Sequence, residues 1–130
     1  MLILRLAVAI ILLTHGVPGM FDGSIHAFGD LFLNPLGFAP FGVAIAWAIK
    51  LSHVGAAVVL VLNRWVKPLG FLTIGVLLAG IIMVHFKEGW YVVGGGRNGM
   101  EYNFLLICAL LTIMFPHGLR APAIVAAPAP

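Results

Sequence analysis

Three ionisable side chains stand at the edges of apolar segments, where they could bind a polar ligand or carry protons. His15 and His85 each follow a long apolar run, and Glu101 opens another. Imidazole and carboxylate groups are the usual proton carriers of enzymes, and ionisable groups close to hydrocarbon are generally paired or functional. We therefore take His15, His85 and Glu101 as candidate catalytic residues. The alternative is that they sit in water at helix ends, where Glu101 would also face a helix N-terminal dipole.

Lys50 and His53 form a second candidate group, because they lie three residues apart on one face of an apolar segment. A lysine in the middle of a bilayer costs roughly 3 kcal/mol, so Lys50 should face the bundle interior or a polar cavity. It is then neutral, or reaches Glu101 or a bound anion, or takes a counter-ion from a partner subunit, unless its long stem carries the amine to an interface. We expect Lys50 and His53, deeper than the first group, to bind a cofactor together with Arg97 and Asn98.

A metal site is a weaker candidate. Asp22, His26 and Asp30 follow the spacing i, i+4, i+8, and side chains of these types can hold a divalent ion. Most such stripes are only the solvent-exposed face of a helix. A small transporter or metal-handling membrane protein is therefore a minor alternative. The sequence carries no motif for haem, flavin or an iron–sulfur cluster.

The composition indicates a membrane protein. Of the 130 residues, 62% are hydrophobic and only 8% are charged, which a soluble fold could not bury. A bilayer core takes roughly 20 apolar residues per helix, so the chain can hold four spans with short connections. We predict an all-α, four-transmembrane-helix bundle forming one domain over residues 1–120. Its spans are expected at about 2–20, 41–62, 69–86 and 101–116, and an Ala/Pro-rich tail follows at 121–130.

The connection between the first two spans should contain a short amphipathic helix on the membrane surface. Ile25, Phe28 and Phe32 fall at helical spacing, opposite the polar stripe that includes Asp22 and His26. The apolar face would then lie in the bilayer boundary and the polar face in water.

Basic residues predict the orientation, since cytoplasmic loops carry an excess of Lys and Arg. One side has Arg5, Arg64, Lys67 and Arg120, whereas the other combines acidic residues with Lys87 and Arg97. Both termini should be cytoplasmic, in a multi-pass protein of the inner (cytoplasmic) membrane, and His15, His85 and Glu101 should gather at the outer face. The basic residues are scattered singly, so nucleic acid is not an expected partner.

Two stretches resemble the DoxX family of small four-helix membrane proteins. The first is Thr14-His15-Gly16-Val17-Pro18, and the second joins His85-Phe86-Lys87-Glu88-Gly89-Trp90 to Gly95-Gly96-Arg97-Asn98-Gly99-Met100-Glu101-Tyr102-Asn103-Phe104-Leu105-Leu106. The likeness covers most of residues 1–120. Family members often carry a lysine soon after the His-Gly pair and a glutamate in the second helix, whereas this chain has Gly19 after Pro18, and Lys50 and His53 in the second helix.

The family is named for a small membrane subunit of a thiosulfate:quinone oxidoreductase, so the resemblance implies a quinone-linked redox setting. The leading hypothesis is a subunit of a redox complex that binds a quinone at the outer face and receives electrons from a partner. The alternative is a non-catalytic structural or assembly subunit, packed in the bilayer against other membrane subunits or in a homo-oligomer. Its close contacts would use the small residues of the second and third spans: Gly55, Ala56, Ala57, Gly75, Ala79 and Gly80.

Overall fold

The computed structural model describes residues 1–94 and 97–118, and every regular element in these residues is helical. Arg120 and the tail at 121–130 lie outside the described residues, as do Gly95 and Gly96 of the Gly-rich loop. Arg120 is one of the basic residues that predicted the orientation of the chain in the membrane.

The first helix, α1 (Leu2–Gly16), is followed by a 3-10 turn, η1 (Pro18–Met20). Val17 still donates its backbone N–H to the Leu13 carbonyl at 2.8 Å, whereas Pro18 has no N–H to continue the ladder. A short helix, α2 (Ser24–Ala27), then begins after Gly23, whose φ of +79° reverses the chain. The last turn of α1 is thus followed within a few residues by a second helical segment.

The segment η2 (Phe28–Phe38) is a π-helix that continues α2, and its regular geometry is interrupted at Gly37, with φ of +102°. Its apolar side packs against the third helix, where Ile25 and Leu33 are buried beside Ala46. The backbone N–H of Gly42 donates to the Asn34 side chain at 2.9 Å, which ties the end of η2 to the next helix. The connection is therefore helical and mostly of π type.

Two long helices follow. The helix α3 (Gly42–Leu62) ends in a turn where Asn63 and Trp65 both have positive φ, and α4 (Val66–Gly80) begins directly after it. A π-helical segment, η3 (Ile81–His85), and a 3-10 turn, η4 (Phe86–Glu88), extend α4. The last helix, α5 (Glu101–Met114), follows the loop that spans residues 89–100.

Three of these helical stretches are long and apolar enough to cross a membrane: Leu2–Met20, Gly42–Leu62 and Val66–Glu88. Their bounds agree with the predicted spans within a few residues. The helix α5 is apolar but has 14 residues, or about 21 Å, which is less than a bilayer core of about 30 Å. The region predicted as the fourth span is therefore an apolar helix that ends before Phe115 and is shorter than the other three stretches.

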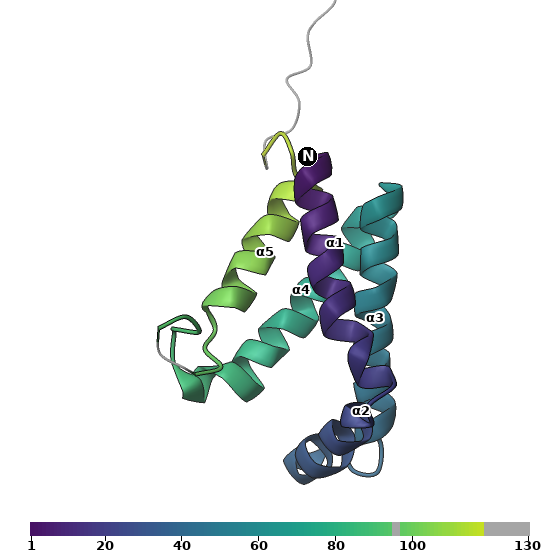
Figure 1. Ribbon diagram of the computed structural model, residues 1–130, viewed down its shortest axis with the longest axis vertical. Helices are drawn as coiled ribbons and strands as arrows, with labels where there is room; N and C mark the ends of the chain where they lie inside the picture. The colour runs from purple at the N-terminus through teal and green to yellow at the C-terminus, as the bar shows by residue number, and fades with distance from the viewer. Residues whose placement is uncertain (95–96, 119–130) are drawn as a thin grey trace, which may run out of the picture.

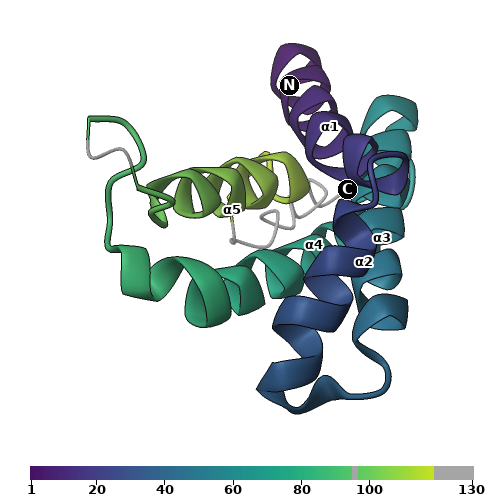
Figure 2. The ribbon, with the colours of Figure 1, turned by 60° about the horizontal axis from the view of Figure 1, so that its bottom comes forward.

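The helices α1, α3, α4 and α5 form two antiparallel pairs, α1 with α3 and α4 with α5 (Figure 1). The pairs meet near the N-terminus, where the C-terminal end of α5 lies beside α1. They diverge toward the opposite end, where α2 and the 89–100 loop are found, and Figure 2 shows α4 and α5 running together away from α3. Large apolar side chains remain exposed along the outer faces, as expected for surfaces that contact lipid.

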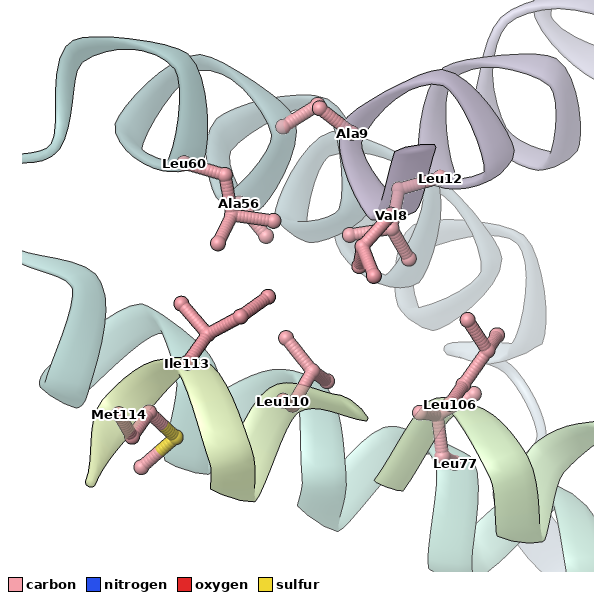
Figure 3. Packing of buried hydrophobic residues seen from close by; sticks show 11 residues of the cluster. Val8, Ala9, Leu12, Ala56, Leu60, Leu77, Leu106, Leu110, Ile113 and Met114 are labelled. Carbon is pink, nitrogen blue, oxygen red and sulfur yellow. The ribbon is translucent and has the colours of Figure 1, made fainter. Parts of the chain in front are cut away.

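The core lies where the two pairs meet. Val8 and Leu12 of α1 face Leu106 and Leu110 of α5, while Leu60 approaches from α3 (Figure 3). Small residues bring the helices close at this contact, including Ala9 of α1 and the buried Ala56 and Ala57 of α3. These two alanines, predicted as contact residues for a partner, are used inside this chain.

Candidate functional site

A cleft of about 940 Å³ opens between the two helix pairs. One wall comes from the end of α1, from α2 and η2, and from α3, whereas α4, η3 and α5 form the other. Most of the lining is apolar, with Phe28, Phe32 and Phe71 among its aromatic members. A cleft of this size and character suits an apolar small molecule with a few polar atoms.

His15, Lys50 and His53 lie together on the first wall. The Lys50 Nζ donates to the backbone carbonyl of His15 at 2.9 Å, and the His15 and His53 rings lie 5.6 Å apart between centroids, tilted by 58°. The prediction that Lys50 and His53 lie deeper than His15 and away from it is therefore wrong. Because α1 and α3 are antiparallel, the last turn of α1 lies beside the middle of α3.

The position of Lys50 answers the question of how its charge is accommodated. Its amine reaches the C-terminal end of α1, where unpaired carbonyls carry partial negative charge and favour a cation. Gly16 leaves room for this contact, since a Cβ there would lie 3.3 Å from the Lys50 carbonyl. A Cβ on Gly19 would lie 3.7 Å from the Lys50 Cε, which is an ordinary contact distance. Of the candidate partners weighed for Lys50, Glu101 is not the one it contacts.

His53 is almost completely buried, with 2% of its surface exposed. Its Nδ1 bonds the Ile49 carbonyl, one turn earlier in α3, at 2.7 Å. This bond fixes the orientation of the ring against α3, and the other edge of the ring adjoins the cleft.

His85 lies on the second wall, at the end of the π-helical segment η3. Its Nδ1 bonds the backbone carbonyl of Asn98 at 2.7 Å, so the 89–100 loop holds the ring. Single π-helical turns are frequent at functional sites. His15 and His85, predicted to lie at one depth, thus line the same cleft from opposite walls.

Glu101 has a different environment from the two histidines. One oxygen of its carboxylate accepts the backbone N–H groups of Val92 at 2.7 Å and Val93 at 3.0 Å. The backbone N–H of Glu101 in turn donates to the Trp90 carbonyl at 3.0 Å. Glu101 does not line the cleft. The structure therefore brings together two of the three predicted catalytic residues. The third, Glu101, lies outside the cleft and binds the backbone of the preceding loop.

The predicted binding residues of the loop separate in the same way. Asn98 lines the cleft and supplies the carbonyl that holds His85, whereas Arg97 is exposed and borders a smaller hollow outside the cleft with Glu88 and Trp90. Arg97 therefore cannot contact a ligand in the cleft from its present position.

The predicted metal stripe is not assembled. Asp22 precedes α2, and its carboxylate accepts the Ser24 backbone N–H at 2.9 Å, while Asp30 accepts the Asn34 side-chain N–H at 3.2 Å. The bond from Ser24 is the main reason that the pKa of Asp22 lies below its usual value. From Phe28 onward the π-helical turn also changes which residues share a face. No group of three potential ligands, including His26, forms within the described ranges.

Sequence reasoning missed several polar residues of the cleft. Asn103 is buried and donates its side-chain N–H to the Leu77 carbonyl at 3.4 Å, and Ser24 and Tyr102 also line the cleft. The signal for Asn103 was an amide inside an apolar helix, since a buried polar group needs a partner.

The electrostatics of the cleft limit its ligand. Its ionisable lining includes His15, Lys50, His53 and His85, and none of the described lining residues is an aspartate or a glutamate. Such a lining disfavours a cationic ligand. In comparisons with known proteins, no family model, no curated protein and no solved structure matches this chain.

Proposed function

We propose that the chain is a small multi-pass protein of the inner membrane, with four spans and both termini in the cytoplasm. The three long apolar helices supply three spans, and α5, tilted beside α4, would be the fourth. A locally thinned bilayer or flanking polar residues accommodate a short span at modest cost. The amphipathic segment of α2 and η2 would lie at the outer surface, beside the open end of the cleft.

Within this framework the chain is a subunit of a redox complex that binds a quinone in the cleft. The observation that carries this proposal is the pairing of a large apolar cleft with histidines on both walls, His15 and His53 facing His85. A quinone headgroup is a flat apolar ring with two opposed oxygen atoms, and hydrogen-bonding groups on both walls suit such a ligand. The exposed Phe71 and Leu72 at the side of the cleft offer a path for an apolar tail.

The redox setting is supported by the resemblance to the DoxX family. No motif in the sequence encodes haem, flavin or an iron–sulfur cluster, so a partner subunit would supply electrons. In this proposal His15 and His85 flank the ring of the ligand and carry protons, and Lys50 and His53 complete the polar wall. Glu101 contributes through the loop that it holds.

A photoreactive quinone tests the proposal directly. The full chain, purified in mild detergent with any bound partners, would be illuminated with an azido-ubiquinone analogue and its modified peptides identified. We expect labelling of the last turn of α1 and the middle of α3, suppressed by excess short-chain ubiquinone and weakened in His15→Ala. The exposed His26, which does not line the cleft, provides the control variant His26→Ala.

Labelling that misses the cleft, or that excess ubiquinone does not suppress, would contradict quinone binding. A companion measurement is quinone-dependent electron transfer in membranes carrying His15→Ala or Lys50→Met. Unchanged turnover in both variants, together with a stable co-purifying complex, would favour the structural subunit instead. The two measurements thus separate a binding role from a scaffolding role.

A further inference from the structure

The hydrogen bonds of two histidines define which nitrogen of each ring carries the proton. His53 Nδ1 and His85 Nδ1 each lie 2.7 Å from a backbone carbonyl oxygen, that of Ile49 and that of Asn98. A carbonyl oxygen can only accept a hydrogen bond, so Nδ1 must be the protonated nitrogen in both rings. In a neutral imidazole the other nitrogen, Nε2, is then an acceptor with a free lone pair.

Both Nε2 atoms adjoin the cleft. His85 Nε2 lies 4.0 Å from the place that a Cβ on Gly80 would occupy, and Gly80 lines the cleft. For His53, the relevant quantity is the exposed surface of the Nε2 atom. In the part of the chain that the structure describes, the only fully buried side-chain nitrogen or oxygen atom without a partner is Arg5 Nε. No bond to His53 Nε2 is found there either, so that atom keeps some exposed surface although the residue as a whole is 2% exposed, and His53 lines the cleft.

The polar chemistry of the cleft is therefore richer in acceptors than its histidine content suggests. Asn103 adds to this, because one of its two side-chain N–H groups is used toward the Leu77 carbonyl and its side-chain oxygen accepts no hydrogen bond among the described residues. A quinone also offers only acceptors, in its two carbonyl oxygens, and so cannot bond to an Nε2 lone pair. The reduced form, a hydroquinone, carries two O–H donors in the same positions.

We propose that the cleft recognises the reduced form of the quinone, a hydroquinone whose hydroxyl groups donate to His53 Nε2 and His85 Nε2. This inference rests on the proposed function, since it specifies the redox form of the ligand at the same site. It concerns binding only. Tighter binding of the reduced form would make a bound quinone easier to reduce than the free molecule.

The test compares three ligands that share one ring. A short-chain ubiquinone, its quinol and the dimethyl ether of that quinol would be bound to the full chain in nanodiscs, by equilibrium dialysis without oxygen. The ether keeps the ring and oxygen atoms of the quinol but cannot donate, and the quinone, which has no added methyl groups, controls for its larger size. We expect the quinol to bind about tenfold more tightly than the ether or the quinone, as one or two net hydrogen bonds provide.

Variants then locate the preference. His53→Phe and His85→Phe keep an aromatic ring but remove the lone pair, so each should lower quinol affinity several-fold and leave ether affinity unchanged. His85→Gln, whose amide oxygen can accept near the position of Nε2, should recover part of the loss. His26→Phe, on an exposed side chain outside the cleft, should change neither affinity.

Nitrogen NMR of unaltered, histidine-labelled protein reads the two rings directly. In their neutral forms both His53 and His85 should show a protonated Nδ1 and an unprotonated Nε2, and single His→Phe spectra serve only to assign the signals. A protonated Nε2 on either ring would overturn the inference, and so would an ether that binds as tightly as the quinol. If none of the three ligands binds, the proposed function fails as well, which distinguishes the two failures.

Discussion

Lys50 Nζ donates a 2.9 Å hydrogen bond to the backbone carbonyl of His15, joining the middle of α3 to the last turn of α1. The bond depends on close approach of the two helices. At Gly16 a Cβ would lie 3.3 Å from the Lys50 carbonyl and 3.5 Å from the His53 Cβ. The hydrogen bond between Lys50 and His15 in the wall of the cleft therefore requires a residue without a side chain at position 16.

Gly16→Val should push α1 away from α3 and weaken this bond. Overpacking of a tight contact costs about 1–3 kcal/mol, so we expect a lower unfolding temperature in detergent. The matched control is Gly55→Val in α3, because a Cβ on Gly55 meets nothing within 4 Å. If the two variants melt at the same temperature, the close approach at Gly16 does not limit the packing of α1 on α3.

The amphipathic segment should be sensitive at Gly29. A Cβ there would lie 2.5 Å from the backbone N and Cα of Val43, and backbone atoms cannot move aside as a side chain can. We expect Gly29→Ala to detach η2 from α3, destabilising the protein by about 1–3 kcal/mol and exposing Leu33. Limited proteolysis within residues 24–40 would report the change. Gly75→Ala, at a helical position with no atom within 4 Å, should leave the cleavage pattern as it is in the unaltered protein.

Hydropathy was sufficient to predict the long helices, because a bilayer span is encoded locally by length and apolar composition. The helical spacing of Ile25 and Phe28 likewise indicated that the connection between the first two long helices is helical. The π-helical geometry of Phe28–Phe38 was not predictable, because the spacing of apolar residues indicates a helix without distinguishing α-turns from π-turns. The local sequence patterns therefore predicted the positions of the helices, but not which segments are α-helical and which are π-helical.

The candidate site was predictable in its residue types but not in its grouping. His15 and Lys50 are 35 positions apart in the sequence, and their contact follows from the pairing of α1 with α3. The sequence analysis placed the two residues at different depths, because each depth was estimated from the distance to the end of its own helix. In the structure α1 and α3 are antiparallel and their ends are offset, so the two residues are neighbours. Glu101 was predicted as a site residue from its type, but its bonds to Val92 and Val93 depend on how the loop closes.

Asp22 provides a prediction of pH dependence. The Ser24 backbone N–H, followed by the Ser24 side chain, holds the pKa of Asp22 below its usual value. A carboxylate with a lowered folded pKa adds stability above its unfolded pKa, and this is lost as pH falls through the folded pKa. By NMR, Asp22 should titrate below an ordinary aspartate, and Ser24→Ala should raise its midpoint only partly, because the backbone N–H remains. An Asp22 midpoint at or above that of a free aspartate would show that the turn does not form in solution.

Glu101 should act on the site through the loop that it closes. Its carboxylate accepts from Val92 and Val93, and the same loop carries the Asn98 carbonyl that holds His85 Nδ1. Glu101→Ala removes the acceptor, so the Val92 and Val93 amides should exchange their hydrogens faster.

Glu101→Gln keeps a side-chain oxygen and should retain part of that protection, because a neutral amide oxygen accepts more weakly than a carboxylate. Glu88→Ala is the matched control, since the exposed Glu88 makes no hydrogen bond among the described residues. The decisive reading is His85, whose nitrogen spectrum should lose its single protonated Nδ1 form in Glu101→Ala and keep it in Glu88→Ala. If the amides of Val92 and Val93 exchange faster while His85 is unchanged, the loop is closed by Glu101 but does not hold the histidine.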